Sequence, residues 1–235
     1  MIGAVGAATP RRSLSRFLLW ATGEIFVVVA GVLIAFGLNA WWIDRSARLE
    51  EQMHLRALER DFERNVSIYT TLLEREEEIV TASRELLQLA RKQPGAEAAI
   101  VSPLMGHVFQ SLRMEPALDA YQALVNSAGL TLLRDEELRG DLAGFASRGV
   151  DPYFARYSDQ LYMAFTTRFV GRLQIAGIAD DEPSPGQSYA DLLGDSAFQE
   201  HLALRHFVER DVAGEYRQLL HQAEDILARL RTQIE

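Results

Sequence analysis

Residues 17–43 read FLLWATGEIFVVVAGVLIAFGLNAWWI, and this stretch decides the architecture of the chain. It holds one ionisable residue, Glu24, in 27 positions. At about 1.5 Å per residue, a helix of this length measures about 40 Å, which exceeds the ~30 Å hydrocarbon core of a bilayer. Trp20 at one end and Trp41 and Trp42 at the other suit the interfacial positions that indole rings prefer. The stretch therefore predicts one transmembrane helix with tryptophan anchors at both interfaces.

A cleaved signal peptide is the alternative interpretation of the same stretch. Arg11, Arg12 and Arg16 form a basic leader, and Leu38-Asn39-Ala40 resembles a strained cleavage site. The apolar run is too long for a signal peptide, and Leu38 is too large for the small-residue position of such a site. We therefore favour a retained helix.

Basic residues near the two ends of the span are almost evenly balanced, with three arginines within residues 11–16 and three within 45–56. The positive-inside rule alone does not choose an orientation. The leader, residues 1–16, contains no acidic residue, and the absence of cysteine suits an oxidising compartment. We expect a single-pass protein of a bacterial inner membrane, with the leader in the cytoplasm and residues 44–235 in the periplasm.

One side of the span is small and polar. At about 100° per residue, Glu24, Gly31, Ala35 and Asn39 lie within about 80° of one another, and we call these four residues the membrane contact face. Gly31 and Ala35 form a small-xxx-small pair, which allows two helix backbones to approach closely. Glu24 and Asn39 bracket this pair with groups that need hydrogen-bond partners. The face predicts packing against another protein helix.

Glu24 lies about 9 Å from the middle of the span, within the ~15 Å half-thickness of the hydrocarbon, where an ionised carboxylate is costly. A partner contact or simple packing is one interpretation, and an ion or proton pathway is another. We favour a partner contact, because polar groups inside membranes commonly face other protein segments.

Gly23-Glu24-Ile25, Gly31-Val32-Leu33-Ile34-Ala35, Asn39 and Trp41 carry a resemblance. Residues 18–42 resemble the amino-terminal GEI...GVLIA signature of an uncharacterised bacterial single-pass membrane family, a domain of unknown function with a long helical region after the anchor. Residues 121–129 and 132–138 are similar to a second stretch of that family. Ala40 stands where the family usually has an asparagine. The resemblance implies a shared architecture and no particular reaction.

Beyond the anchor, residues 43–92 contain neither proline nor glycine. Their apolar residues recur mostly at steps of three and four, which predicts one long helix continuing from the anchor and ending at Gln93-Pro94-Gly95. The apolar positions on which this prediction rests are Leu49, Met53, Leu58, Phe62, Val66, Tyr69, Leu73, Val80, Leu87 and Ala90.

The rest of the chain predicts shorter helices and one more long one. Ser102-Pro103 is expected to start a helix that runs to about Arg113, Pro116 to start one that runs to Ser127, and Asp135 to cap the next.

Asp151-Pro152 restarts the chain, residues 179–187 form the clearest loop, and a last helix runs from Asp195 toward Gln233. Its predicted buried residues are Phe198, Leu202, Val212, Tyr216, Leu219, Ala223, Ile226 and Leu230. No segment alternates as a strand does, so we expect an all-α antiparallel bundle.

The sequence contains little that indicates chemistry. Its net charge of -9 and lack of a basic stripe argue against a nucleic-acid partner, and the absence of cysteine excludes disulfides and thiolate sites. Glu51-x-x-His54 is half of a di-iron signature without a second half, and residues 180–182 lack the EF-hand spacing for calcium. The aromatic residues between 153 and 169 favour core packing over a ligand pocket. We therefore expect no catalytic site, no cofactor and no metal.

Taken together, these features favour a non-enzymatic structural or accessory subunit of a larger inner-membrane complex, for example a respiratory or photosynthetic one. Its expected partners are other integral membrane subunits, or further copies of itself, and the lipid bilayer. Two alternatives stay open: a periplasmic helical-bundle sensor that acts through a partner, and a homo-oligomeric ion pore lined by Glu24.

Overall fold

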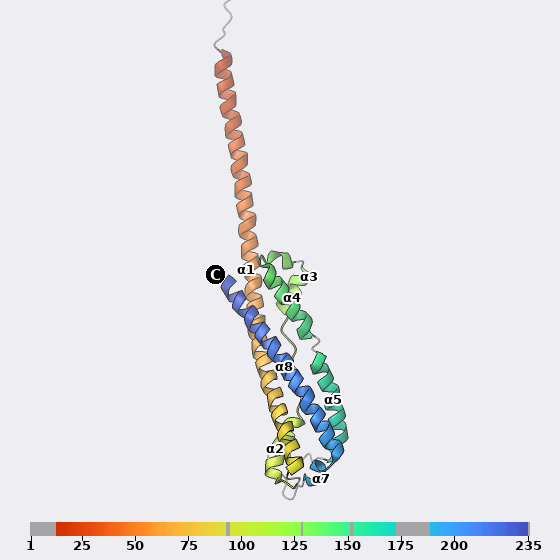
Figure 1. The fold of residues 1–235 in the computed structure, drawn as a ribbon. Helices are drawn as coiled ribbons and strands as arrows, with labels where there is room; N and C mark the ends of the chain where they lie inside the picture. Colours follow the sequence, from red (N-terminus) through yellow and green to blue (C-terminus); the bar gives the residue numbers. More distant parts are fainter. Residues whose placement is uncertain (1–12, 93–94, 128, 151–152, 173–188, 235) are drawn as a thin grey trace, which may run out of the picture. The chain divides into compact units, whose positions relative to one another are not determined.

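The computed structural model describes residues 13–92, 95–127, 129–150, 153–172 and 189–234. These residues form helices and connecting segments and no strand, which confirms the all-α fold (Figure 1). The helices are α1 (Ser13–Lys92), α2 (Ala98–Val108), α3 (Asp119–Asn126), α4 (Glu136–Val150), α5 (Tyr153–Phe169), α7 (Ala190–Leu193) and α8 (Ser196–Gln233), with short 3-10 helices η1 (Gly129–Leu132) and η2 (Val170–Arg172). The chain divides into two units, Met1–Gln52 and Met53–Glu235, and the second unit is the bundle.

A strict repeat of three and four residues builds the two long helices of the bundle. Because such a repeat averages 3.5 residues per turn, the same stripe faces the neighbouring helix along the whole length, as in a coiled coil. The buried stripe of α1 is Leu55, Leu58, Phe62, Asn65, Tyr69, Leu72, Glu76, Ile79, Ser83, Leu86 and Ala90. That of α8 is Phe198, Leu202, Arg205, Glu209, Val212, Tyr216, Leu219, Ala223, Ile226 and Leu230.

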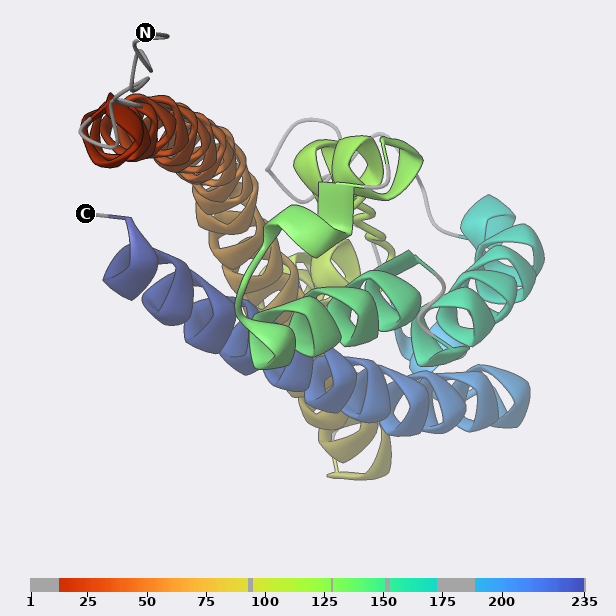
Figure 2. The same cartoon turned by 90° about the horizontal axis from the view of Figure 1, so that it is seen from above.

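The two stripes run antiparallel. The rings of Tyr69 and Tyr216 lie 6.1 Å apart, and Ser83 Oγ lies 3.1 Å from His206 Nδ1. Residue numbers therefore rise along α1 as they fall along α8, as the ribbon also shows (Figure 1). Helices α4 and α5 lie alongside α8 and close the bundle (Figure 2).

The core of the bundle consists of two apolar clusters. The first joins α1 up to Leu72 with α3, α4 and the part of α8 from Val208 onward. The second joins α1 from Ala82 with α2, the end of α5, α7 and α8 up to Leu202. The predicted buried residues of the last helix are all buried, so that prediction is confirmed.

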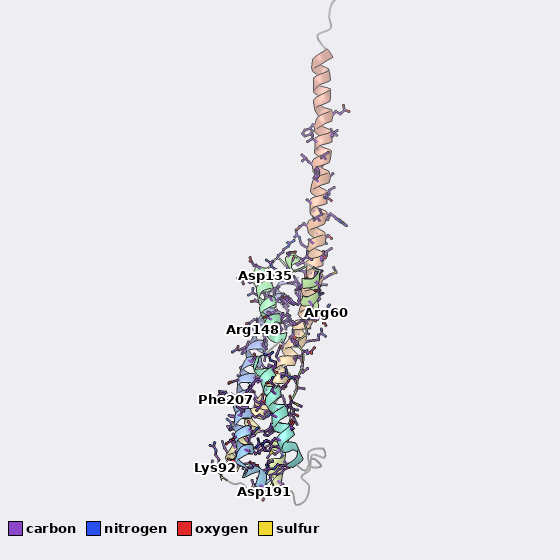
Figure 3. The ribbon with its side chains drawn as sticks, turned by 90° about the vertical axis from the view of Figure 1, so that its right-hand side faces the viewer. Arg60, Lys92, Asp135, Arg148, Asp191 and Phe207 are labelled. Atoms are coloured by element: carbon purple, nitrogen blue, oxygen red, sulfur yellow. The ribbon has the colours of Figure 1, made fainter. Side chains whose placement is uncertain are left out.

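Two predicted helix starts are confirmed by their caps. Asp135 Oδ1 accepts a hydrogen bond from the Leu138 amide at 3.0 Å, and Asp195 Oδ1 accepts one from the Ala197 amide at 2.8 Å. These side chains satisfy backbone donors that have no partner inside the helix. Asp135 precedes α4 and Arg148 lies in its last turn (Figure 3). The predicted end of the first long helix is also correct, because α1 ends at Lys92.

The predicted bounds of two helices are wrong. α2 begins at Ala98 and ends at Val108, so Pro103 lies inside it instead of in its first turn. The buried stripe Val101, Met105 and Val108 outweighs the single backbone bond that Pro103 cannot donate. α3 begins at Asp119 instead of Pro116.

Two of the apolar positions that predict the long helix, Leu49 and Met53, are 55% and 65% exposed. The buried stripe starts at Leu55. Val66, Leu73, Val80 and Leu87 are only partly buried, since they flank the stripe. The expected loop at residues 179–187 and the restart at Asp151-Pro152 lie outside the described residues.

Candidate functional site

The four residues of the membrane contact face all lie on α1 and are all exposed. Helical spacing places Glu24, Gly31, Ala35 and Asn39 on one side, as expected. Opposite them, large apolar side chains are exposed, among them Phe26 at 72% and Leu33 at 65%.

Among the described residues, α1 is the helix that is long and apolar enough to cross a membrane, and none of its most apolar window is buried inside the structure. Trp41 and Trp42 are exposed at 59% and 69%. The side chain of Trp20 lies outside the described residues. A candidate membrane span is therefore present near the N-terminus.

A second site lies inside the bundle, and we call Glu76, Arg205 and Glu209 the buried charge cluster. Their exposed fractions are 6%, 1% and 1%. Glu76 comes from α1, and the other two come from α8. Glu76 and Arg205 lie between the two apolar clusters along their helices, and Glu209 lies at the edge of the first cluster. All three belong to the contact between α1 and α8, which we call the seam and where side chains would ordinarily be apolar.

Arg205 is held by three elements. Its Nη2 donates to the Gln110 carbonyl at 2.8 Å, and its Nη1 lies 3.3 Å from Glu209 Oε1. The guanidinium carbon stands 5.1 Å from the centre of the Tyr162 ring, a cation–π arrangement. Burial lowers the pKa of Arg205, but a guanidinium starts so high that it stays charged.

Glu209 accepts its hydrogen bond from α5. Ser158 Oγ lies 2.8 Å from Glu209 Oε1 and 2.9 Å from Oε2, so its hydroxyl donates to this carboxylate. Arg205 supplies the positive charge beside it. Glu209 is therefore the carboxylate of the cluster with both a donor and a counter-ion.

Glu76 has a different environment. Burial raises the pKa of Glu76 to about 9, and the charge of Glu209 and a hydrogen bond with its carboxyl act in the same direction. Arg205 and Arg113 oppose this rise without cancelling it. Among the described residues, Glu76 Oε2 has no hydrogen-bond partner. The raised pKa of Glu76 therefore favours its protonated, uncharged form at neutral pH.

The neighbouring layer of the seam is neutral as well. Burial raises the pKa of Tyr69 to about 12 and also raises the pKa of Tyr216. Both phenols keep their protons. Arg205 is thus the charged group that balances Glu209 inside the seam.

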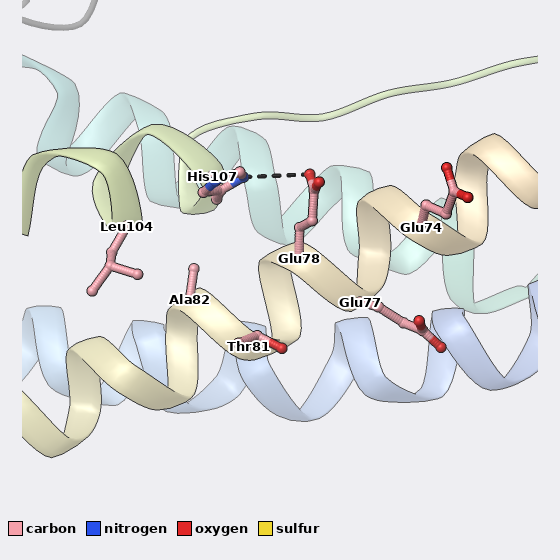
Figure 4. Close-up of a pocket in the computed structure, with 7 residues that line it drawn as sticks. All are labelled: Glu74, Glu77, Glu78, Thr81, Ala82, Leu104 and His107. Atoms are coloured by element: carbon pink, nitrogen blue, oxygen red, sulfur yellow. Dashed lines mark ion pairs between the residues drawn. The ribbon is translucent and has the colours of Figure 1, made fainter. Parts of the chain in front are cut away.

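A surface groove of about 510 Å³ lies between α1 and α2 (Figure 4). Its walls carry three carboxylates, Glu74, Glu77 and Glu78, together with His107, whose Nδ1 lies 3.4 Å from Glu78 Oε2. Glu78 also accepts from Arg75 Nη1 at 2.6 Å. Within the described ranges, no group of three or more histidine, cysteine or acidic side chains is placed to hold a metal ion.

Two of the described aromatic residues of α5 pack in the core. Phe165 and Phe169 are buried and pack against Phe198 at ring distances of 5.6 and 5.3 Å, as core packing predicts. Tyr157 is exposed. The side chains of Tyr153 and Phe154 lie outside the described residues.

Sequence reasoning missed the buried charge cluster. The signal was present, because Glu76 follows Phe62 and Tyr69 at seven-residue steps and Arg205 and Glu209 continue the repeat of α8. Counting apolar residues alone skips these polar members of the stripe.

Comparison with family models, curated proteins and solved structures finds no match for this chain. The resemblance of residues 18–42 to a single-pass membrane family stays a prediction.

Proposed function

We propose that this chain is a non-enzymatic accessory subunit of a larger complex in a bacterial inner membrane, in which residues 17–43 span the bilayer. The leader lies in the cytoplasm and the bundle in the periplasm. The membrane contact face binds an integral membrane subunit, and the bundle is the chain's periplasmic part.

The observation that supports this proposal is that the membrane segment of α1 is exposed and has a large apolar side opposite a small polar side. Side chains such as Phe26, Leu33 and Phe36 are exposed in the structure, and large contiguous apolar surfaces indicate a membrane or protein contact. Lipid chains can cover the apolar side of the helix. Lipid chains offer no hydrogen-bond partner to Glu24 and Asn39, and another protein helix supplies these partners inside the bilayer.

Gly31 allows a sharp test, because the helix offers a matched control. A Cβ added at either Gly31 or Gly37 meets no atom within 4 Å, so a larger side chain disturbs neither site within the chain itself. Six residues apart at about 100° each, the two glycines lie on different sides of the helix. Gly31 belongs to the membrane contact face, and Gly37 belongs to the lipid side.

We predict that the tagged full-length protein, extracted from native membranes in mild detergent, migrates in a particle much heavier than its own 26.4 kDa, together with a second integral membrane protein. Gly31→Leu removes that protein, because the longer side chain holds the two backbones apart. Gly37→Leu retains it. Mass spectrometry and light scattering of the purified particle give the readout.

A monomer in all three preparations would overturn the proposal. A particle containing only copies of this chain would also overturn it and would favour the pore lined by Glu24, whose conductance should then change in Glu24→Gln.

A further inference from the structure

We propose that Glu76 and Glu209 form a proton-binding site, in which one proton shared between the two carboxyls is the ligand that joins α1 to α8 in the bundle. This inference goes beyond the accessory role and does not depend on it.

The first argument is the count of buried charges. Two carboxyls and one guanidinium are at least 94% buried, so ionising both acids leaves one negative charge uncompensated where water cannot reach it. Arg113 also acts on Glu76, but its side chain is 46% exposed and pairs with Asp159, so it lies outside the buried charge cluster. One proton makes the cluster neutral.

The second argument is the count of donors. Ser158 Oγ donates to Glu209, Arg205 Nη1 lies beside Glu209 as its counter-ion, and Arg205 Nη2 donates to the Gln110 carbonyl. Glu76 and Glu209 occupy the same layer between α1 and α8, and two carboxyls that lie together can share a hydrogen bond only if one of them carries a proton. Because Ser158 donates to Glu209 and the Arg205 guanidinium stands beside it, the proton belongs on Glu76.

The third argument is the position in the fold. Tyr69 and Tyr216 face each other across the seam, and seven residues further along α1 and seven back along α8 stand Glu76 and Glu209. The carboxyl pair is therefore the next layer between the same two helices. Apolar residues of the two clusters pack on either side of this layer and exclude water from it.

All the ionisable groups around Glu76 are consistent with one bound proton. From α1 there is Tyr69, and from α8 there are Arg205, Glu209, Glu215 and Tyr216. From α5 come Tyr162, against the guanidinium, and Asp159, against Arg113. The segment after α2 contributes Arg113 itself. Arg205 is the buried cation among them.

Removal of the proton should loosen this layer. With both carboxyls ionised, two like charges face each other across the contact between α1 and α8, with one guanidinium for both. The packing of α1 on α8 therefore depends on whether Glu76 carries a proton.

Infrared spectroscopy of the full-length chain in detergent tests the site directly, because a protonated carboxyl has a carbonyl stretch that a carboxylate lacks. The measurement is made in a Glu24→Gln background, which removes the carboxyl of the membrane segment. We expect a protonated-carboxyl band at neutral pH that disappears as the pH is raised through about 9.

Adding Glu76→Gln should abolish this band, because it removes the carboxyl that carries the proton. Adding Glu85→Gln should leave it unchanged, because Glu85 is an exposed carboxyl of the same helix. Absence of the band in the Glu24→Gln background would overturn the inference, and so would its persistence after Glu76→Gln in a protein whose helical circular dichroism is unchanged.

Discussion

Glu76 is 6% exposed, whereas Glu85, on the same helix, lies open to solvent. Burial raises the pKa of Glu76 from an ordinary 4.5 to about 9. Between these values the folded chain holds a proton that the unfolded chain releases. The stability that Glu76 contributes is therefore complete below about pH 4.5 and is lost as the pH rises through about 9.

This linkage predicts a pH-dependent difference between two variants. Relative to Glu76→Gln, the wild-type bundle should lose unfolding free energy as the pH rises from about 5 to about 8, at up to about 1.4 kcal/mol per pH unit. Relative to Glu85→Gln, it should show no such slope. Denaturant titrations of the full-length protein in detergent, followed by circular dichroism, provide the measurement. Parallel curves for wild type and Glu76→Gln would contradict the protonated state.

Arg205 is a second ionisable side chain whose burial determines its role, here with a positive charge. A buried guanidinium in a seam of Leu, Phe and Tyr is unfavourable unless its partners are fixed, because removing charges from water costs several kcal/mol per ion. The Gln110 carbonyl, Glu209 and the Tyr162 ring supply those partners from three segments. The charged layer therefore specifies which faces of α1, α5 and α8 meet.

At the scale of elements, α1 also fixes the segment that leads into α3. Asn65 is fully buried; its Nδ2 donates to the Ala117 carbonyl at 2.9 Å, and its Oδ1 accepts from the Ala117 amide at 2.7 Å. Asp61, four residues earlier, accepts from the Ala120 amide at 2.8 Å. These side chains replace backbone partners, which explains why the chain at Pro116 stays non-helical.

Asn65→Ala should destabilise the bundle by about 2 to 3 kcal/mol, because two hydrogen bonds are lost and the Ala117 amide and carbonyl are left without their partner. Peptide bonds between residues 109 and 118 should also become accessible to a protease. Ser67→Ala, at an exposed position of α1, is the control and should change stability little. Denaturation and limited proteolysis measure both effects, and equal behaviour of the two variants would show that Asn65 does not anchor this segment.

Helix existence was predictable here, and some bounds were not. Asp135 and Asp195 predict the starts of α4 and α8 correctly, because capping depends on a few neighbouring residues. Pro103 misled the prediction of α2, since its preference for a first turn is outweighed by the burial of Val101, Met105 and Val108 against other helices. Such contacts between distant segments cannot be inferred from the sequence around Pro103 alone.

The sites divide in the same way. The membrane contact face follows from helical geometry alone, because a single helix fixes which of its residues share a side. The buried charge cluster depends on the pairing of two helices and joins residues about 130 positions apart in sequence. Glu76, Arg205 and Glu209 resemble ordinary surface charges until the apolar repeat is followed through them.

At the scale of the whole molecule, the chain contains two units with different requirements. Met1–Gln52 exposes apolar side chains, and Met53–Glu235 buries a core of its own. The bundle is self-contained, whereas the first unit needs an environment that covers it. The proposed function assigns that environment to lipid on one side of the helix and to a protein partner on the other.

Cross-linking inside native membranes tests this assignment most directly, and the chain contains no cysteine that would interfere. Gly31→Cys and Gly37→Cys each introduce one thiol, to which a short photoreactive group is attached. We predict that illumination joins the Gly31→Cys variant to one discrete integral membrane protein, while the Gly37→Cys variant labels lipid. Equal protein cross-linking from both positions, or labelling of lipid alone from both, would contradict a protein-binding face on this helix.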